Sequence, residues 1–333
     1  MTSILLKQIN LKRISPNTYA VSWDTEWTLG TTLMGGCVAA QIHHAAATHL
    51  VTDAALAAQN QPDILSLHVE FLRPCERLDS CISITPLKVG PVACTLQLQL
   101  SQAGKLRVVA LATSTNFDQS LGPDATTAWS LHPPPSPKPD FDRVLAHQPD
   151  ENWIPGILDG EIISVTRRKL GLHPRAGFPV AGVCDAWNCF LADERMDATY
   201  LTMMADIIPS MSDTLMRNGG LYDAHAFQDR MERWAQNNPG IPCLLTNTIA
   251  EAMQAKTFNH TVNLDIEYKR RLPREGQQWL FSRASTKMLQ GGRMDLDITM
   301  CNEHMELVAI AHQNILVLEA QRKFRKRSEV AAL

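Results

Sequence analysis

The order of predicted secondary-structure elements occurs twice along the 333-residue chain, and this duplication limits the possible folds more than any other feature. In the first half, a helix that begins near residue 35 precedes strand-like segments at 64–72, 80–87, 93–101 and 106–115. In the second half, a helical run at 200–209 precedes segments at 260–268, 279–288, 294–300 and 306–318. Glu267 follows Glu70 by 197 residues. Asn302 follows Gln102 by 200 residues. This near-constant offset predicts two copies of one α+β unit, each a helix with an antiparallel sheet.

The first-half helix has the composition of a deeply buried element. It opens with Gly35-Gly36 and continues as CVAAQIHHAAATHL, without glycine or proline. Alanine favours helix, and its small side chain lets a sheet approach the helix axis closely. The glycines have two explanations: a tight strand-to-helix turn, or a place where the backbone must approach a ligand.

Composition divides the chain into four parts. We expect an N-terminal domain over 1–120, a linker over 121–183, a C-terminal domain over 184–320 and a basic tail over 321–333. The linker contains LHPPPSPKPD, an extended proline-rich segment. Residues 217–259 form an insertion without a counterpart of that length in the first half. Its segment 224–236 is predicted to be helical, as a channel cap or as an ordinary packing helix.

Bulk properties exclude several classes of protein. The net charge of −3 gives no general attraction to nucleic acid, and no window approaches the length of a membrane span. The eight cysteines contain no CxxC pair, which predicts reduced thiols in a cytosol-like compartment. The C-terminal sequence shares only Leu333 with the peroxisomal SKL signal, so we predict a cytoplasmic protein without a clear peroxisomal signal.

The second-half helical run, YLTMMADIIP, contains a single carboxylate, Asp206. An ionised carboxylate among apolar side chains needs hydrogen-bond partners. Asp206 is therefore either a capping or turn acid close to Pro209 or a catalytic acid with polar partners from elsewhere in the chain.

Several familiar sites are absent from the sequence. There is no GxSxG, GxGxxG, Walker or HExxH motif, so a serine nucleophile, a nucleotide cofactor and a zinc site are not indicated. His43, His44 and His49 lack metal-ligand spacing. His68 is expected to be a packed or hydrogen-bonded strand residue, and His312 to face the opposite side of its strand from residue 313.

Short motifs occur in both halves of the chain. In the first half they are Gly35-Gly36, the segment HVEFLRP at 68–74 and Val89-Gly90. In the second half they are Ala205-Asp206, the segment TVN at 261–263 and LVAIAHQ at 307–313. Together these motifs resemble those of the double-hotdog acyl-CoA thioesterases of the TesB-like group and their fungal relatives. The resemblance implies a double hotdog fold, in which tandem antiparallel sheets each wrap a long helix.

The same resemblance implies a function and a set of site residues. Asp206, Thr261 and Gln313 match the family's catalytic Asp, Thr and Gln, which hold a water for attack on the thioester. Gly35 and Gly36 are candidates for backbone contact with the substrate. Arg270 and Arg271 belong to a basic cluster that either contacts the coenzyme A phosphates or is a solvated strand end.

The implied substrate is a small-molecule acyl thioester, and an acyl carrier protein is a second possible partner. Coenzyme A enters as part of the substrate, and neither a cofactor nor a metal is expected. The family resemblance also implies a homo-oligomer. Two alternatives remain open, because fold does not fix function: another hotdog enzyme (dehydratase, isomerase, cyclase or polyketide release) and a non-catalytic acyl-binding protein.

Overall fold

The computed structural model describes residues 8–192, 194–220 and 222–320. The predicted basic tail lies outside the described residues. Within the described part, no helix has the length and hydrophobicity needed to cross a membrane.

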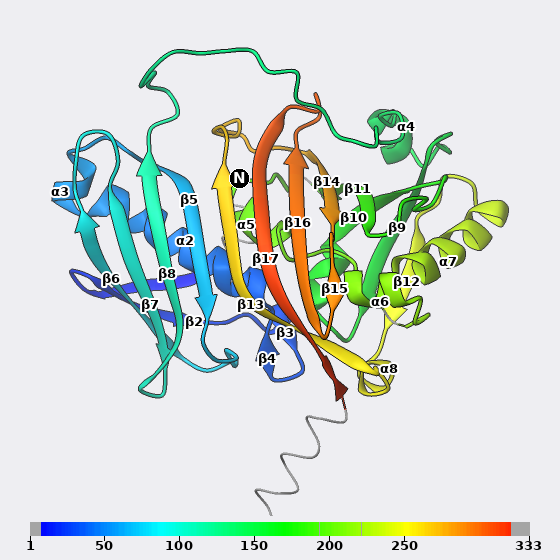
Figure 1. The fold of residues 1–333 in the computed structure, drawn as a ribbon, viewed down its shortest axis with the longest axis horizontal. Coiled ribbons are helices and arrows are strands. Elements are labelled where there is room, and N and C mark those ends of the chain that lie inside the picture. The colour runs from blue at the N-terminus through cyan, green and yellow to red at the C-terminus, as the bar shows by residue number, and fades with distance from the viewer. Residues whose placement is uncertain (1–7, 193, 221, 321–333) are drawn as a thin grey trace, which may run out of the picture.

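The N-terminal half is a sheet curved around one long helix, α2 (Gly35–Thr52). Its strands lie in the order β1-β2-β6-β7-β8-β5, and neighbouring strands are antiparallel. They are β1 (Asn10–Ser15), β2 (Thr18–Ser22), β5 (Asp63–Phe71), β6 (Ser80–Lys88), β7 (Thr95–Gln102) and β8 (Lys105–Thr115). Shorter elements are η1 (Thr25–Trp27), β3 (Thr28–Leu29), β4 (Thr32–Leu33) and α3 (Ala54–Ala57). As expected, Ala39, Ala40, Ala45 and Ala46 of α2 are fully buried, and the helix runs behind the strands in Figure 1.

The C-terminal half repeats this order and adds strands at its outer edge. Its sheet runs β13-β17-β16-β14-β11-β10-β9-β12, with β15 paired to β16. The strands are β9 (Trp153–Gly160), β10 (Lys169–Pro174), β11 (Val183–Phe190), β12 (Cys243–Asn247), β13 (Thr257–Tyr268), β14 (Trp279–Ser285), β15 (Leu289–Gln290), β16 (Arg293–Cys301) and β17 (Leu307–Glu319). The helices are α4 (Phe141–Leu145), η2 (Ser164–Arg168), α5 (Ala198–Met204), α6 (Met211–Met216), α7 (Ala224–Asn237) and α8 (Ile249–Met253). The first-half series β2, α2, β5, β6, β7, β8 thus corresponds to β11, α5, β13, β14, β16, β17.

The two halves join through equivalent strands. β5 pairs antiparallel with β13, so the two sheets form one continuous surface (Figure 1). Leu67 lies opposite Ile266 and Val69 opposite Leu264. All four side chains are buried in a hydrophobic core that includes residues of both halves. The predicted double hotdog architecture is confirmed.

The structure corrects the predicted linker over 121–183. β9 and β10 lie within that range and extend the C-terminal sheet, so the irregular connection is shorter. In β10, the apolar Leu170 and Leu172 alternate with Lys169, Gly171 and His173. This alternation indicates a strand, but it was missed because it is short and lies beside turn residues.

The proline-rich segment is packed against the outer face of the C-terminal sheet. Trp153 Nε1 donates a 2.6 Å hydrogen bond to the carbonyl of Pro137, and Phe141 stacks on Trp279 at 4.5 Å. Figure 1 shows this connection passing from β8 to α4 along one end of the strands.

The structure also corrects one expectation about a helix and decides between the two interpretations of another. α5 contains only 7 residues, so the second unit wraps a short helix. In the 217–259 insertion, α7 packs against β9 and β12 through Phe227 and Met231. α7 is thus a packing helix of the sheet edge, while α8 lines a cavity described below.

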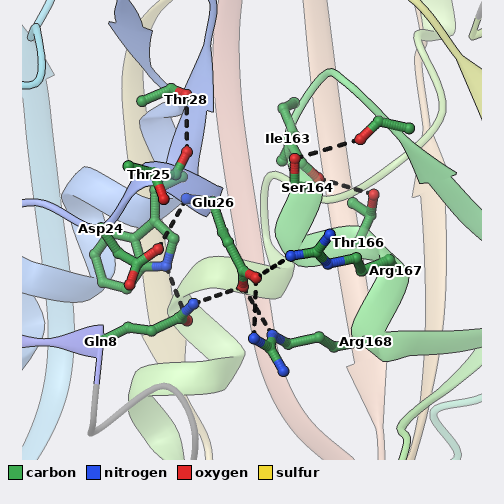
Figure 2. A network of polar contacts seen from close by, with 12 residues as sticks. Gln8, Asp24, Thr25, Glu26, Thr28, Ile163, Ser164, Thr166, Arg167 and Arg168 are labelled. Atoms are coloured by element: carbon green, nitrogen blue, oxygen red, sulfur yellow. Dashed lines mark hydrogen bonds and ion pairs between the residues drawn. The ribbon is translucent and has the colours of Figure 1, made fainter.

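A polar cluster ties the start of the N-terminal half to the C-terminal half. Glu26 of η1 accepts hydrogen bonds from Arg168 at 2.7 and 2.9 Å, from Arg167 at 2.5 Å and from Gln8 at 2.7 Å. Figure 2 shows these side chains converging on one carboxylate. Burial raises the pKa of Glu26, but the bonds from Arg168 and Arg167 outweigh it and hold the pKa below its ordinary value. A nearby backbone hydrogen bond from the Ile163 N–H to the Thr28 carbonyl also joins the two halves.

We expect Glu26→Gln to lower the free energy of unfolding by about 1 kcal/mol, a value reduced because both arginines reach solvent. Because the folded-state pKa is depressed, this contribution is present at neutral pH and is lost as the pH falls through that pKa. Urea unfolding at pH 7 and at acidic pH measures both effects. Glu267→Gln, which removes an exposed pair with Lys269, is the matched control and should change little. Equal effects of the two substitutions would contradict a special role for Glu26.

Candidate active site

Asp206 lies in a turn that follows α5, one residue beyond the helix C-cap Ala205. Its N–H donates to the carbonyl of Met203 at 3.1 Å. The helical run was expected to reach Pro209, but the helix ends at Met204 and Asp206 lies in the turn that follows. The carboxylate is therefore free to point away from the α5 axis.

The partner of Asp206 is the first turn of α2, in the other half of the chain. Asp206 Oδ2 accepts a 2.7 Å hydrogen bond from the Gly36 N–H. The N-cap residue of α2 is Met34, whose side chain makes no capping bond. A carboxylate at this end is favoured by the free N–H groups and by the helix dipole. Asp206 thus caps a helix, as one interpretation of the sequence held, but the helix belongs to the other domain.

Glycine at position 36 makes this approach possible. A Cβ added to Gly36 would lie 2.7 Å from Asp206 Cβ and 2.7 Å from the Met203 carbonyl oxygen. At Gly35 an added Cβ would lie 3.2 Å from Asp206 Oδ2. The Gly35-Gly36 pair therefore gives the Asp206 turn room against the helix end.

Gln313 is the second partner of Asp206. It lies on the inner face of β17, is fully buried and donates from Nε2 to the Ala205 carbonyl at 2.8 Å and to Asp206 Oδ1 at 3.3 Å. Its Oε1 accepts a 3.2 Å hydrogen bond from the Thr261 hydroxyl. His312 faces the other side of the strand, as expected, and contacts Asp297 at 2.7 Å.

A β-bulge turns Thr261 toward this group. Leu264 and Ile266 of β13 face the core, so strict alternation would turn Val262 inward and Thr261 outward. In the pairing with β17, however, Thr261 lies opposite Ile315 and Asn263 lies opposite Asn314. The extra residue in β13 shifts the alternation by one. Thr261, Gln313, Asp206 and Gly36 consequently form one hydrogen-bonded chain that crosses the two halves.

Burial raises the pKa of Asp206 from 3.8 to about 6, although the hydrogen bonds from Gly36 and Gln313 favour the ionised form. The carboxyl group is therefore ionised at neutral pH and becomes protonated close to pH 6. A raised pKa close to the working pH is typical of a general base.

Two cavities meet at Asp206. The larger, about 620 Å³, is lined by all three candidate catalytic residues together with Gly35 and residues of α8. The smaller, about 110 Å³, lies between the Asp206 turn and the inner faces of β9, β10 and β11. Met34, Ile163 and Tyr222 line both cavities. The site therefore has a wide chamber and an adjoining small chamber, and Asp206 lines both.

The backbone N–H groups of the two predicted substrate-contacting glycines differ in whether they already have a hydrogen-bond partner. Gly36 N–H is occupied by Asp206. Gly35 N–H has no hydrogen-bond partner within the described part of the chain and belongs to the same helix end. Gly35 is therefore the available backbone donor beside the carboxylate.

Arg270 and Arg271 lie at the other end of β13 from Thr261, about 30 Å along the strand. Arg270 pairs with Glu306, and Arg271 pairs with Asp63 and Asp118. Neither residue lines either cavity. Both side chains have acidic partners and lie far from Asp206, and their contact with the phosphates of coenzyme A stays a prediction.

Metal-ligating clusters were not expected from the sequence. Over residues 8–192, 194–220 and 222–320, no group of three His, Cys, Asp or Glu side chains is arranged to hold a metal ion. His43 instead contacts Thr199 at 3.2 Å, and His68 contacts Asp265 at 2.5 Å.

Sequence reasoning missed several residues that line the cavities. Arg73 is the only Arg or Lys among the described residues of the larger cavity. Lys169, His173 and Asn188 line the smaller one. The period-two spacing of Lys169, Gly171 and His173 was the available signal, but it lay in the supposed linker.

Comparison with known proteins identifies the family. A family model described as the acyl-CoA thioesterase N-terminal domain matches residues 23–116, and one described as the acyl-CoA thioesterase C-terminal domain matches residues 132–317. The chain belongs to the acyl-CoA thioesterase family. This assigns it to a family of thioester hydrolases and confirms the resemblance noted from the sequence.

Individual relatives agree with this assignment. The thioesterase-like protein TwmA of Talaromyces wortmannii is 25% identical over 337 residues, covering 95% of this chain and 92% of the relative. A putative thioesterase II from Thermobifida fusca has a TM-score of 0.65 at 16% identity, covering 95% of this chain and 98% of the other. The acyl-CoA thioesterase II TesB2 of Mycobacterium marinum has a TM-score of 0.57 at 17% identity, covering 95% and 97%. At these identities, the two structures support the hotdog fold alone.

We expect Gly36→Ala to disturb the contact between α2 and the Asp206 turn, because the added methyl group meets a backbone carbonyl and must displace it. Overpacking of this kind lowers the free energy of unfolding by about 1–3 kcal/mol. Denaturant unfolding measures the loss. Gly122→Ala, at a glycine with open space around it, is the control. A Gly36→Ala variant as stable as the control would contradict the described packing.

Proposed function

We propose that this protein hydrolyses an acyl-CoA thioester with a water molecule activated by Asp206. One observation carries the proposal: an ionisable carboxylate, held by Gln313 and a helix N-terminus, faces a cavity of about 620 Å³ that Thr261 also lines. Membership of the thioesterase family supports the reaction class.

The three side chains have different roles in this mechanism. Both amide hydrogens of Gln313 are engaged by the Ala205 carbonyl and Asp206, and its oxygen receives the Thr261 hydroxyl. Gln313 is therefore a positioning residue that orients the carboxylate. The oxygens of Asp206 and Thr261 keep free lone pairs that accept the hydrogens of one water. Held in this way, the water directs its own lone pair at the carbonyl carbon.

In this mechanism Asp206 carries the transferred proton, and the Gly35 N–H stabilises the developing negative charge. Water attacks the thioester carbonyl, and Asp206 takes one proton from it. The negative charge that develops on the carbonyl oxygen is stabilised by the free N–H of Gly35 at the positive end of α2. When the carbon–sulfur bond breaks, the thiolate leaves and takes up the proton from Asp206. The products are a carboxylic acid and a free thiol.

Asp206→Asn is expected to reduce kcat by about 10²–10⁴, the usual contribution of a general base. Release of free thiol from acyl-CoA substrates measures the loss. Asp229→Asn, at an exposed position of α7, is the control. Substrate conversion without thiol release would favour a dehydratase, isomerase or cyclase, and unchanged hydrolysis by Asp206→Asn would remove the mechanism.

The pH dependence of kcat/KM provides an independent test. Because the base must be ionised and its pKa is raised to about 6, we expect the rate to fall tenfold per unit below about pH 6 and to level off above it. Since this folded-state pKa exceeds the ordinary value, ionisation of Asp206 destabilises the fold at neutral pH. Asp206→Asn should therefore be no less stable than the parent at pH 7.5. A rate that stays constant down to pH 4 would contradict the role of Asp206.

A further inference from the structure

The smaller cavity adjoins the wide chamber at Asp206, so it is a space into which the acyl group of a thioester bound at Asp206 can extend. Its volume is about 110 Å³. An apolar cavity of about 150 Å³ holds a benzene molecule, so this space suits about four or five heavy atoms beyond the carbonyl. It is too small for a long fatty chain.

One wall of this cavity is polar. Lys169, Gly171 and His173 alternate along β10 and so share one face of the sheet. A Cβ at Gly171 would lie 3.5 Å from His173 Nε2 and 3.7 Å from Lys169 Nζ, so both nitrogens lie over this glycine. Gly171 is paired with Gly156 of β9, and both glycines line the cavity. The missing side chain of Gly171 leaves space beside the two nitrogens, whereas Met231 fills the space over Gly156.

Within the described part of the chain, the Lys169 ammonium has one hydrogen-bond partner. Its Nζ donates a 2.7 Å hydrogen bond to Asn188 Oδ1, and Asn188 is fixed in turn by a 2.9 Å bond from its Nδ2 to Ser282 Oγ. No described carboxylate oxygen lies within 4.0 Å of this nitrogen. Asp185 also lines the cavity, but its carboxylate is held by Arg283 at 2.7 and 2.8 Å. Two N–H groups of Lys169 therefore have no acceptor among residues 8–192, 194–220 and 222–320.

The electrostatics of this wall favour an anion. Burial lowers the pKa of Lys169 to about 8, so its ammonium form predominates at pH 7. Burial and then the charge of Lys169 lower the pKa of His173 to about 4, so the imidazole is neutral. The buried Nδ1 of His173 has no partner among the described residues. The wall thus has one uncompensated positive charge in a poorly solvated space, which is costly until an anion binds.

We infer that the smaller cavity is an acyl subsite for a short acyl group that ends in a carboxylate, with Lys169 as the residue that binds this carboxylate. This rests on the proposed thioester hydrolysis at Asp206. A carboxylate supplies both the missing countercharge and acceptors for the free N–H groups. An apolar acyl end leaves the ammonium without either.

Two substrates of equal chain length test the inference. Thiol release is measured with succinyl-CoA and butyryl-CoA, with enzyme-free blanks subtracted. The wild-type enzyme is expected to have a kcat/KM at least about tenfold higher for succinyl-CoA, because hydrogen bonds to charged groups are worth about 1.5–3 kcal/mol. In Lys169→Met, the succinyl-to-butyryl ratio should fall by about tenfold or more. Lys105→Met, at an exposed hairpin position, should keep the wild-type ratio.

A second variant keeps the test decisive if Lys169→Met does not fold. The methyl group of Gly171→Ala makes ordinary van der Waals contacts but occupies the space in front of Lys169. It should lower kcat/KM for succinyl-CoA relative to acetyl-CoA, whose methyl group does not reach that wall. An unchanged ratio in this variant would overturn the inference.

The outcomes separate this inference from the proposed function. Hydrolysis of both substrates with no preference for succinyl-CoA, or a preference that survives Lys169→Met, overturns the subsite and leaves the hydrolase. A Lys169-dependent preference for acetoacetyl-CoA over succinyl-CoA overturns the carboxylate assignment.

If no thiol is released from any substrate, calorimetric binding of succinyl-CoA and butyryl-CoA tests the subsite separately. Tighter binding of succinyl-CoA that is lost in Lys169→Met supports the subsite while the hydrolase proposal fails, and equal binding overturns both.

Discussion

The hydrogen bond between Asp206 and the Gly36 N–H is the interaction on which the site depends. It joins the end of the short second-half helix to the beginning of the long first-half helix, so neither half contains the site alone. The bond compensates part of the burial of the carboxylate and still leaves its pKa raised to about 6. A single contact thus caps α2, orients the candidate base and connects the two halves at the site.

The continuous sheet supplies the other side of the site. Gln313 and Thr261 are brought to Asp206 by the pairing of β13 with β17, and the bulge in β13 decides which residue faces inward. Because Asp206 lines both a wide chamber and a small polar-walled one, the reacting carbonyl and the end of the acyl group have separate surroundings. We propose hydrolysis at the first and selection of the acyl group at the second.

Much of the architecture could be predicted from the sequence because it follows from local periodicity. The helix at Gly35 and the strands from Ile64 to Thr115 show the apolar spacing and turn residues of their elements, and the structure contains them within a few residues. β10 could not be recognised in this way, because Lys169, Gly171 and His173 are residues that strands rarely place on an inner face. Polar side chains and a glycine on this inner face are explained by the cavity that they line.

The sequence by itself determined the duplication, the class of fold and the types of residue available for chemistry, since these depend on patterns within short segments. The tertiary structure decided which groups meet. The bond from Gly36 to Asp206 spans 170 residues, and the inward orientation of Thr261 depends on an irregular pairing with a distant strand. The separation of Arg270 from the site and the unpaired ammonium of Lys169 were decided in the same way. Contacts of this kind arise from the packing of whole sheets, and no local pattern of residues encodes them.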